Sequence, residues 1–215
     1  MNVFIVFAHP EPKSFDGVMR DYALKVLTDM GHSVQISDLY DMRFRPQITI
    51  DDFTDPLDDT FFDLHDEQAH ASRFGTFAPE ILAEQQKLIW ADTLILQFPL
   101  WWYSFPAIMK GWVDRVLAYG FAYGEGRSLT GRRAMLSMTT GGPSRPYSPE
   151  KRATLSKLLD PIQYGTLHLC GMEVLTPFVV YGAASASREQ RKQFLEQYAT
   201  VLSRLETRTP LSFDR

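Results

Sequence analysis

Three aromatic residues stand in a row near the middle of the chain, at Trp101, Trp102 and Tyr103. They follow an apolar run, residues 93–98, that is typical of a buried strand, and they precede a segment of helical spacing that begins near Pro106. Flat ring faces give a planar ligand broad contact at little conformational cost. An aromatic cluster taken alone packs in a core more often than it binds a ligand, so its interpretation depends on the segments that meet it.

The loop that follows the first apolar run is a candidate anion site. Residues 9–14 are polar and turn-rich, and a helical pattern begins directly after them. The free N–H groups and the dipole of a helix start favour an anion, to which the Ser14 hydroxyl and the His9 imidazole can add donors. The loop is neither a dinucleotide-binding G-x-G-x-x-G motif nor a Walker loop. A single histidine after a strand is also often only a structural hydrogen-bonding group.

A third candidate segment follows the apolar run at residues 134–138. Residues 139–142 are two threonines and two glycines, and the glycines let a ligand approach the backbone closely because they lack a Cβ. Tyr147 can donate its hydroxyl to a developing negative charge. Paired glycines are as easily a plain turn, and Tyr147 can simply pack. Taken together, an anion site, an aromatic wall and a glycine edge indicate a flavin, with its phosphate, its ring and the polar rim of that ring.

The elements that position these segments are predicted to form a doubly wound α/β fold, a five-stranded parallel sheet with helices on both faces. Apolar runs alternate with segments of helical spacing, and runs that are apolar throughout are typical of strands buried on both faces of such a sheet. Ligands bind at the carboxyl ends of its strands. The three candidate segments therefore converge at one edge of the sheet. The predicted strands are residues 3–8, 33–37, 93–98, 134–138 and 174–180.

Helices are predicted between these strands from spacing and end signals. Pro79 suits a first helical position, and Ser187 with Gln190 has the form of a capping box. A helical stretch over residues 148–170 contains a proline that can break it. Residues 41–78 are interpreted as an irregular insertion with short helical pieces. Because there is no repeat, low-complexity tract or linker, the 215 residues are expected to form a single domain.

Composition limits the classes of protein to which the chain can belong. It is 45% apolar and 22% charged with a net charge of −4, which gives no field that would attract nucleic acid or an anionic membrane. The one cysteine, Cys170, excludes an internal disulfide. No Cys/His cluster indicates a metal, and no G-x-S-x-G motif indicates a hydrolase. The N-terminus lacks the basic start of a signal peptide, and prolines interrupt the longest apolar stretch, so we expect a cytoplasmic protein without a membrane span.

Short segments spread in order through nearly the whole chain also carry a family resemblance. They are Ala8-His9-Pro10 with Ser14-Phe15, Ser37-Asp38-Leu39-Tyr40, residues 83–88, Gln97-Phe98-Pro99-Leu100, Pro106-Ala107-Ile108 with Lys110-Gly111-Trp112, Phe121-Ala122-Tyr123, Thr139-Thr140-Gly141-Gly142, Tyr147-Ser148 and Pro161-Ile162-Gln163. With these segments the chain resembles the NAD(P)H:quinone oxidoreductases of the DT-diaphorase type, within the flavodoxin-like flavoprotein superfamily.

The resemblance implies a flavodoxin-like sheet, a bound FAD and two-electron transfer from NAD(P)H through the flavin to a quinone. It also implies a homodimer with sites at the interface. Tyr123 and Trp102 would line the acceptor pocket, and Tyr147 would stabilise charge on the reduced flavin. Arg191 and Leu195 match the family's adenine contacts, which favours FAD over FMN. The other cofactor contacts implied by position are His9, Ser14, Phe15, Asp16, Pro99, Leu100, Trp101, Trp102, Tyr103, Thr139, Thr140, Gly141 and Gly142.

Two departures from the family pattern bear on the chemistry. Asp16 stands where the family has asparagine, which adds a negative charge near the expected phosphates. Ala153 stands where the vertebrate enzymes carry the histidine that acts with the tyrosine. Our hypothesis is that Arg152 or Lys151, or Tyr147 alone, stabilises the reduced flavin instead.

Three other functions stay open at this point. One is an FMN-dependent relative that reduces azo dyes or nitroaromatics. Another is an ancillary subunit that regulates a potassium efflux transporter, against which the acidic insertion at residues 51–67 counts, because it is more typical of the free-standing reductases. The third is a one-electron carrier of the flavodoxin type, which would need no substrate-lining Tyr123.

Overall fold

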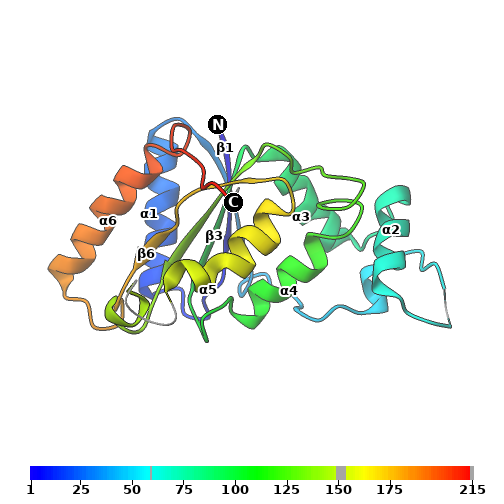
Figure 1. Ribbon diagram of the computed structural model, residues 1–215, viewed down its shortest axis with the longest axis horizontal. Helices are drawn as coiled ribbons and strands as arrows, with labels where there is room; N and C mark the ends of the chain where they lie inside the picture. Colours follow the sequence, from blue (N-terminus) through cyan, green and yellow to red (C-terminus); the bar gives the residue numbers. More distant parts are fainter. Residues whose placement is uncertain (59, 149–153, 214–215) are drawn as a thin grey trace.

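A computed structural model describes residues 1–58, 60–148 and 154–213, and its centre is a parallel sheet with helices on both faces (Figure 1). The strands lie in the order β2-β1-β3-β4-β5, and β6 also pairs with β4. The chain therefore steps one way from β1 to β2 and the other way from β3 onward, so the strand order reverses between β1 and β3. This is the predicted doubly wound fold. The strands are β1 Asn2–Phe7, β2 Ser33–Asp38, β3 Thr93–Pro99, β4 Arg133–Thr139, β5 Glu173–Val174 and β6 Phe178–Val180.

The central strands are buried on both faces because they are apolar on both faces. Every residue of β3 is buried, and so is every residue of β1 after Asn2. Gln97 is a polar exception within β3. Its amide donates to the Asp16 backbone carbonyl at 2.6 Å and its Oε1 accepts from the Tyr198 hydroxyl at 3.3 Å, so both ends of this buried side chain have partners.

The run predicted as one strand at residues 174–180 is split into β5 and β6, which both pair with β4. Pro177 lies in the gap, and proline has no N–H to give to a strand ladder. At the outer edge of β5 the C-terminal segment lies alongside. The Leu211 N–H donates to the Val174 carbonyl at 2.8 Å, and Leu175 forms an antiparallel bridge with Pro210.

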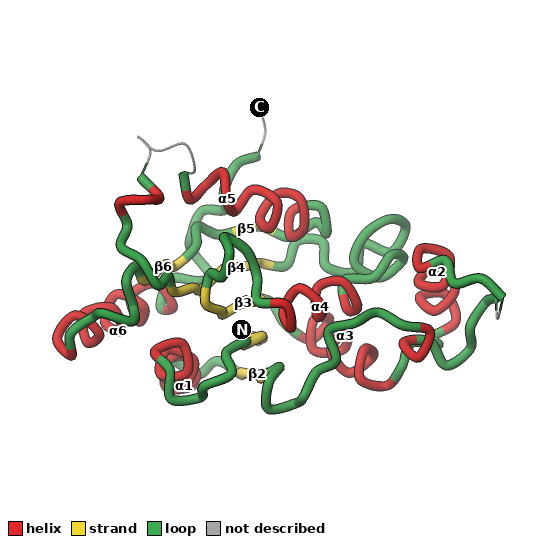
Figure 2. Tube along the Cα trace, turned by 90° about the horizontal axis from the view of Figure 1, so that it is seen from below, coloured by secondary structure: helices red, strands yellow, loops and turns green. Residues whose placement is uncertain are grey.

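Two layers of helices cover the sheet, as the nearly end-on view of the strands makes clear (Figure 2). One layer holds α1 (Phe15–Asp29) and α6 (Arg188–Leu202), whose apolar side chains pack with Val3, Ile5 and Ile95. The other layer holds α3 (Pro79–Trp90), α4 (Ala107–Val116) and α5 (Leu155–Ile162). Among the helices of the described ranges, none has the length and apolar character needed to cross a bilayer.

The helix ends follow the predicted signals more closely than the helix bodies do. Pro79 is a first-turn residue of α3, and Ser187 and Gln190 form both halves of the capping box of α6. Of the stretch predicted as helical over residues 148–170, the described part is helical from Leu155, where α5 begins. Pro161 lies inside α5 without ending it, and the chain continues into a π-helical turn, Gln163–His168. The wider turn begins two residues after Pro161, which has no N–H to donate a backbone hydrogen bond.

The insertion at residues 41–78 contains a 3₁₀ turn, Ile50–Asp52, and the helix α2 (Leu64–Phe74). A buried arginine of α4 holds it in place. Arg115 is 1% exposed, donates from Nε and Nη2 to both Asp52 carboxylate oxygens at 3.0 and 2.8 Å, and donates from Nη1 to the Arg45 carbonyl at 2.6 Å. The buried charge of Arg115 is thus paired and hydrogen-bonded, and these bonds attach the insertion to α4.

Candidate active site

Three loops meet at the carboxyl edge of the sheet, next to the point where the strand order reverses. The loop after β3 is tied to the end of β4 by a hydrogen bond of 2.8 Å from the Leu100 N–H to the Thr139 carbonyl. It also meets the loop after β1, because the Trp101 and His9 ring centres are 6.1 Å apart. The Thr139 hydroxyl donates to the Asp16 carboxylate at 2.8 Å, at the start of α1. The structure therefore brings the three segments together at the edge where ligands bind in such folds.

The aromatic segment forms a tight turn that projects from the surface. Trp101 and Ser104 exchange two backbone hydrogen bonds, of 3.2 and 3.0 Å, so Trp102 and Tyr103 are the two central residues of a small hairpin. Their φ angles are 50° and 60°, the left-handed region that a two-residue hairpin turn demands. Trp102 is 96% exposed and Tyr103 is 51% exposed. The cluster is thus a surface wall and not core, and bulky residues held at positive φ are typical of functional sites.

Tyr147 links this wall to the loop after β4. It ends a short 3₁₀ turn, Arg145–Tyr147, and its ring lies 6.2 Å from the Tyr103 ring in an edge-on arrangement and 5.6 Å from the Tyr181 ring. Burial, with a smaller effect of Tyr103, raises the pKa of the Tyr147 hydroxyl. The phenol is therefore a neutral hydrogen-bond donor at physiological pH. Tyr181 was not predicted from the sequence, although an aromatic residue directly after the last buried strand is the same signal that singled out Trp101.

The backbone at Gly141 and Gly142 is hydrogen-bonded to neighbouring segments, and the space beside both Cα atoms is open. The Gly142 carbonyl accepts from the Gly182 N–H at 2.8 Å and from the Thr140 hydroxyl at 2.7 Å. A Cβ added to Gly141 or to Gly142 would meet no atom within 4 Å. The flat rim of a ligand can therefore reach this backbone closely, as the sequence suggested for a flavin ring.

The loop after β1 folds back on the start of α1. The Ser14 oxygen accepts from the Gly17 N–H at 3.1 Å and so caps the helix. A Cβ on Gly17 would lie 1.9 Å from the Pro12 carbonyl oxygen, so this approach demands glycine, another residue that the sequence analysis missed. The His9 Nδ1 lies 3.0 Å from the Glu11 backbone nitrogen and 3.1 Å from the Glu11 carbonyl oxygen, so the imidazole ring is held against the backbone of its own loop. The loop can thus offer donors to an anion.

Asp16, which was expected to add a negative charge near the phosphates, is a buried residue. The side chain is 3% exposed, with Oδ2 held by the Thr139 hydroxyl and with Oδ1 lacking a hydrogen-bond partner in the described part of the chain. Burial raises the pKa of the Asp16 carboxyl above its ordinary value, although the Thr139 hydrogen bond and the His9 charge lower it in part. A buried carboxyl therefore lies beneath the anion site.

Arg191 and Leu195 lie on α6, beside the start of α1. The Arg191 guanidinium carbon lies 5.5 Å above the Phe15 ring, and its Nη2 donates to the Ala183 carbonyl at 3.4 Å. Leu195 is half-buried and packs against the core between α1 and α6. The contact with Phe15, the first residue of α1, places Arg191 beside the helix start.

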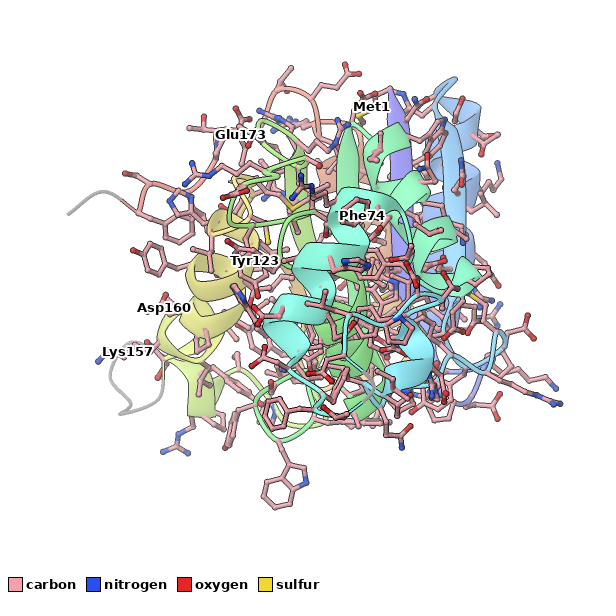
Figure 3. The ribbon with its side chains drawn as sticks, turned by 90° about the vertical axis from the view of Figure 1, so that its right-hand side faces the viewer. Met1, Phe74, Tyr123, Lys157, Asp160 and Glu173 are labelled. Atoms are coloured by element: carbon pink, nitrogen blue, oxygen red, sulfur yellow. The ribbon has the colours of Figure 1, made fainter. Side chains whose placement is uncertain are left out.

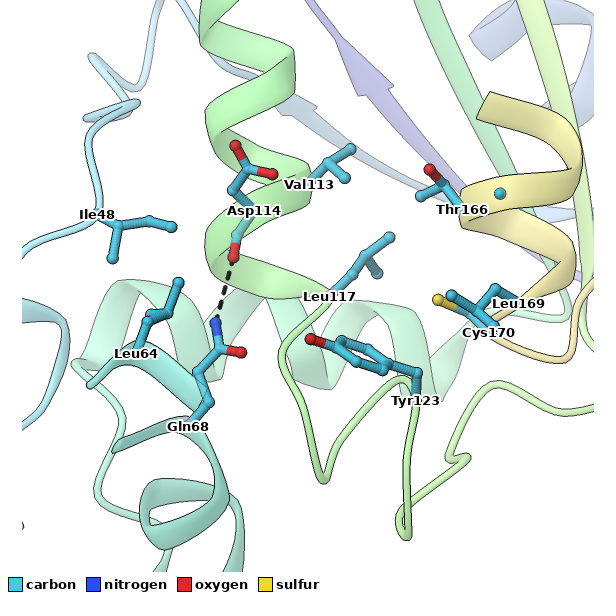
Figure 4. A pocket seen from close by; sticks show the side chains of 11 residues that line it. Ile48, Leu64, Gln68, Val113, Asp114, Leu117, Tyr123, Thr166, Leu169 and Cys170 are labelled. Atoms are coloured by element: carbon cyan, nitrogen blue, oxygen red, sulfur yellow. Dashed lines mark hydrogen bonds between the residues drawn. The ribbon is translucent and has the colours of Figure 1, made fainter. Parts of the chain in front are cut away.

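Tyr123 faces a different cavity, of about 230 Å³, between α2, α4 and the π-helical turn (Figures 3 and 4). The cavity is mostly apolar, and the Cys170 sulfur also points toward it. Burial raises the pKa of the Tyr123 hydroxyl and raises the pKa of the Cys170 thiol to about 11, so both groups keep their protons at neutral pH. The described residues that line this cavity include none from the aromatic turn. Among the described residues, Trp102 is therefore not part of the lining of this cavity.

Arg152, Lys151 and Ala153 lie outside the described residues. Their proposed part in stabilising a reduced flavin therefore stays a hypothesis. The other residues proposed for the site divide into three groups. The carboxyl edge of the sheet carries the loops after β1, β3 and β4 with Tyr147. Arg191 and Leu195 lie on α6, and Tyr123 lines the cavity beside α2 and α4.

The fold and this site define a flavodoxin-like protein, and residues 1–202 match the model of the family with a flavodoxin-like fold. The chain is 40% identical over 216 residues to ribosyldihydronicotinamide dehydrogenase [quinone] of Mus musculus, covering 97% of this chain and 94% of that one. It is 39% identical over 216 residues to NAD(P)H dehydrogenase [quinone] 1 of Rattus norvegicus, covering 97% and 79%. The crystal structure of a Klebsiella pneumoniae protein assigned to the quinone reductases superposes with a TM-score of 0.95 at 41% identity, covering 100% of this chain and 88% of that one. The chain belongs to the NAD(P)H:quinone oxidoreductase family.

Proposed function

We propose that this protein is an FAD-dependent reductase that moves two electrons from NAD(P)H to a quinone. The observation that supports this most directly is the exposed aromatic turn at Trp102 and Tyr103, joined through Tyr147 to the open backbone at Gly141 and Gly142. Such a surface suits the face and the rim of a planar ring system. A bound flavin would supply the reversible two-electron chemistry that connects donor and acceptor.

The chain's own residues would bind and orient the cofactor. The start of α1 and the His9 imidazole can provide donors for phosphate oxygens. Arg191 carries a positive charge beside Phe15, where it can approach the adenosine half of FAD. The neutral Tyr147 hydroxyl can donate to negative charge that develops on the ring, and a positioned donor of this kind stabilises a transition state more than a ground state.

The separate position of Tyr123 supports a homodimer in which each subunit completes the other's acceptor pocket. Its cavity is lined in part by Leu169, whose side chain is 61% exposed. Apolar surface of this kind is commonly covered by a partner. A second subunit could then bring the Tyr123 hydroxyl toward a planar acceptor lying on Trp102. The single buried thiol of Cys170 is in keeping with a reducing compartment such as the cytoplasm.

Purification followed by heat release and chromatography of the pigment tests the cofactor, and oxidation of NADH or NADPH with a benzoquinone tests the reaction. We expect FAD and quinone-dependent turnover with two-electron stoichiometry. Released FMN would show that Arg191 and Leu195 do not select an adenosine group, and an azo dye replacing the quinone as the better acceptor would favour the FMN-dependent reductases. A colourless protein that cannot be loaded with FAD or FMN would refute the proposal.

A further inference from the structure

A buried carboxyl lies between the first turn of α1 and the end of β4, next to the point where the loops after β1, β3 and β4 meet. Asp16 is the second residue of α1, after the cap Ser14, and its side chain is 3% exposed. Its one side-chain hydrogen bond comes from the Thr139 hydroxyl to Oδ2, at 2.8 Å. Oδ1 is buried and has no partner among the residues that the structure describes.

The charged form of this carboxyl has little compensation. Two titratable groups act on it, the His9 imidazole from the loop after β1 and the Tyr198 phenol from α6, and no Lys or Arg is among the groups of the described ranges that shift its pKa. The positive end of α1 favours a nearby negative charge. Burial of a carboxylate with a single hydrogen bond is costly, and it is burial that dominates the pKa of Asp16, raising it.

An anionic ligand at the start of α1 would add to this cost. The phosphates of a flavin would draw on the same N–H groups and the same helix dipole that favour the Asp16 charge. Two negative charges that share one site raise the proton affinity of the weaker acid. The carboxyl has a free oxygen to hold a proton, because Oδ2 is engaged by Thr139 and Oδ1 is not.

We propose that the protein takes up a proton at Asp16 when it binds the diphosphate of its flavin, so that cofactor affinity weakens as the pH rises. The inference rests on the proposed flavin-binding function and adds to it that pH regulates the affinity for the cofactor. No covalent step is involved. The proton comes from solvent, is held on the Asp16 carboxyl while the diphosphate is bound, and is released when the cofactor leaves.

The test is the dissociation constant of FAD, measured by titration of flavin-free protein across about pH 5 to 9, a range in which the diphosphate itself does not change charge. Uptake of one proton makes the constant rise by up to about tenfold per pH unit where the free carboxyl is ionised. Calorimetry of the unmodified protein in two buffers of different ionisation enthalpy counts the proton directly, without a variant. Riboflavin is the matched ligand, since it has the ring but no phosphate, and its affinity should not carry the slope.

Two variants show which residue binds the proton. Asp16→Asn keeps the size and the Thr139 hydrogen bond but cannot ionise, so its FAD affinity should be flat over the same pH range and tighter than that of the wild type at the alkaline end. His9→Gln should keep the slope, because the imidazole is not the group that binds the proton.

A slope lost in His9→Gln and kept in Asp16→Asn would overturn the proposal, and so would binding of FAD without proton uptake. Failure of FAD, FMN and riboflavin to bind at all would instead overturn the proposed function. If the dissociation constants of riboflavin and FAD rose equally with pH, proton uptake would not depend on the phosphates, which would also overturn the proposal.

Discussion

The Tyr147 ring lies edge-on to the Tyr103 ring, with the ring centres 6.2 Å apart, and this contact joins the loop after β4 to the aromatic turn after β3. The contact places a neutral phenol between two segments that we propose to contact the flavin. In that proposal the Tyr147 hydroxyl donates a hydrogen bond to negative charge on the bound ring.

Removal of that hydroxyl should slow flavin reduction without weakening the fold. In Tyr147→Phe the ring contacts remain, and the rate of flavin reduction by NAD(P)H in a stopped-flow experiment should fall by about 10²-fold, the usual effect of losing one donor to developing charge. Tyr164→Phe removes a hydroxyl from an exposed ring on the π-helical turn and should leave the rate unchanged.

The same experiment on Arg152→Ala separates the remaining hypotheses. If Arg152 stabilises the reduced flavin, its loss should also slow reduction about 10²-fold. Normal kinetics in Arg152→Ala together with slow kinetics in Tyr147→Phe would leave the tyrosine acting without it.

Two tryptophans of the same segment should respond in opposite ways. Trp102 is 96% exposed, so Trp102→Asn, which tolerates the positive φ of the turn, should change the free energy of unfolding by no more than about 0.5 kcal/mol. It should nevertheless raise the KM for a quinone. Trp112 is fully buried and donates to the Glu84 carboxylate at 2.8 Å, so Trp112→Ala should cost about 3–5 kcal/mol. Urea unfolding and steady-state kinetics check both. Large destabilisation in Trp102→Asn would mean that the turn is part of the core after all.

Two glycines provide a second matched pair. A Cβ at Gly141 meets open space, so Gly141→Ala should fold normally while its FAD dissociation constant rises about tenfold or more, because the methyl group occupies the ligand's side. A Cβ at Gly17 would lie 1.9 Å from a backbone carbonyl, so Gly17→Ala should lower the melting temperature instead. Calorimetry and flavin titration of the two variants distinguish a ligand-facing glycine from a packing glycine, and unchanged flavin affinity in Gly141→Ala would place the ring elsewhere.

The buried carboxyl also predicts how stability depends on pH in the flavin-free protein. Because burial raises the pKa of Asp16 in the folded state, the folded protein holds more protons there than the unfolded chain does between the ordinary aspartate pKa and the folded value. Stability should therefore fall as the pH rises through that window. Asp16→Asn should lack this fall and should be about 1–3 kcal/mol more stable than the wild type above it. Denaturant unfolding at a series of pH values measures the difference, with the exposed Asp29→Asn as the control. A wild type and an Asp16→Asn variant that lose stability in parallel would contradict it.

The sheet was predictable from the sequence because its central strands are buried on both faces, which leaves an unbroken apolar run. The convergence of three loops followed from the same strands, since the carboxyl ends of parallel strands lie at one edge. Pro177 was visible in the sequence, but the two short strands on either side of it read as one run. The π-helical turn after Pro161 had no sequence signal, because proline is expected to end a helix and here it does not.

Side-chain surroundings were the part that the sequence could not supply. Trp102 and Tyr103 adopt positive φ angles that glycine or asparagine usually occupy, so the tight turn could not be recognised from residue type. Asp16 looked like a charge beside an anion site, and only the packing of Thr139 and α1 shows it to be buried. Tyr123 belongs to the same family pattern as the aromatic turn, but nothing in a linear pattern reveals that it faces another cavity of the same chain.

The C-terminal segment beside β5 has a consequence for how copies of the chain can associate. Leu211 and Pro210 occupy backbone positions that a foreign strand would need in order to extend the sheet past β5. An edge that is already paired does not serve as a template for sheet-to-sheet growth or aggregation. Association of copies at this side must then use helices and loops. Removal of the residues after 208 would expose the unpaired backbone groups of the β5 edge, which could then pair with a strand of another copy.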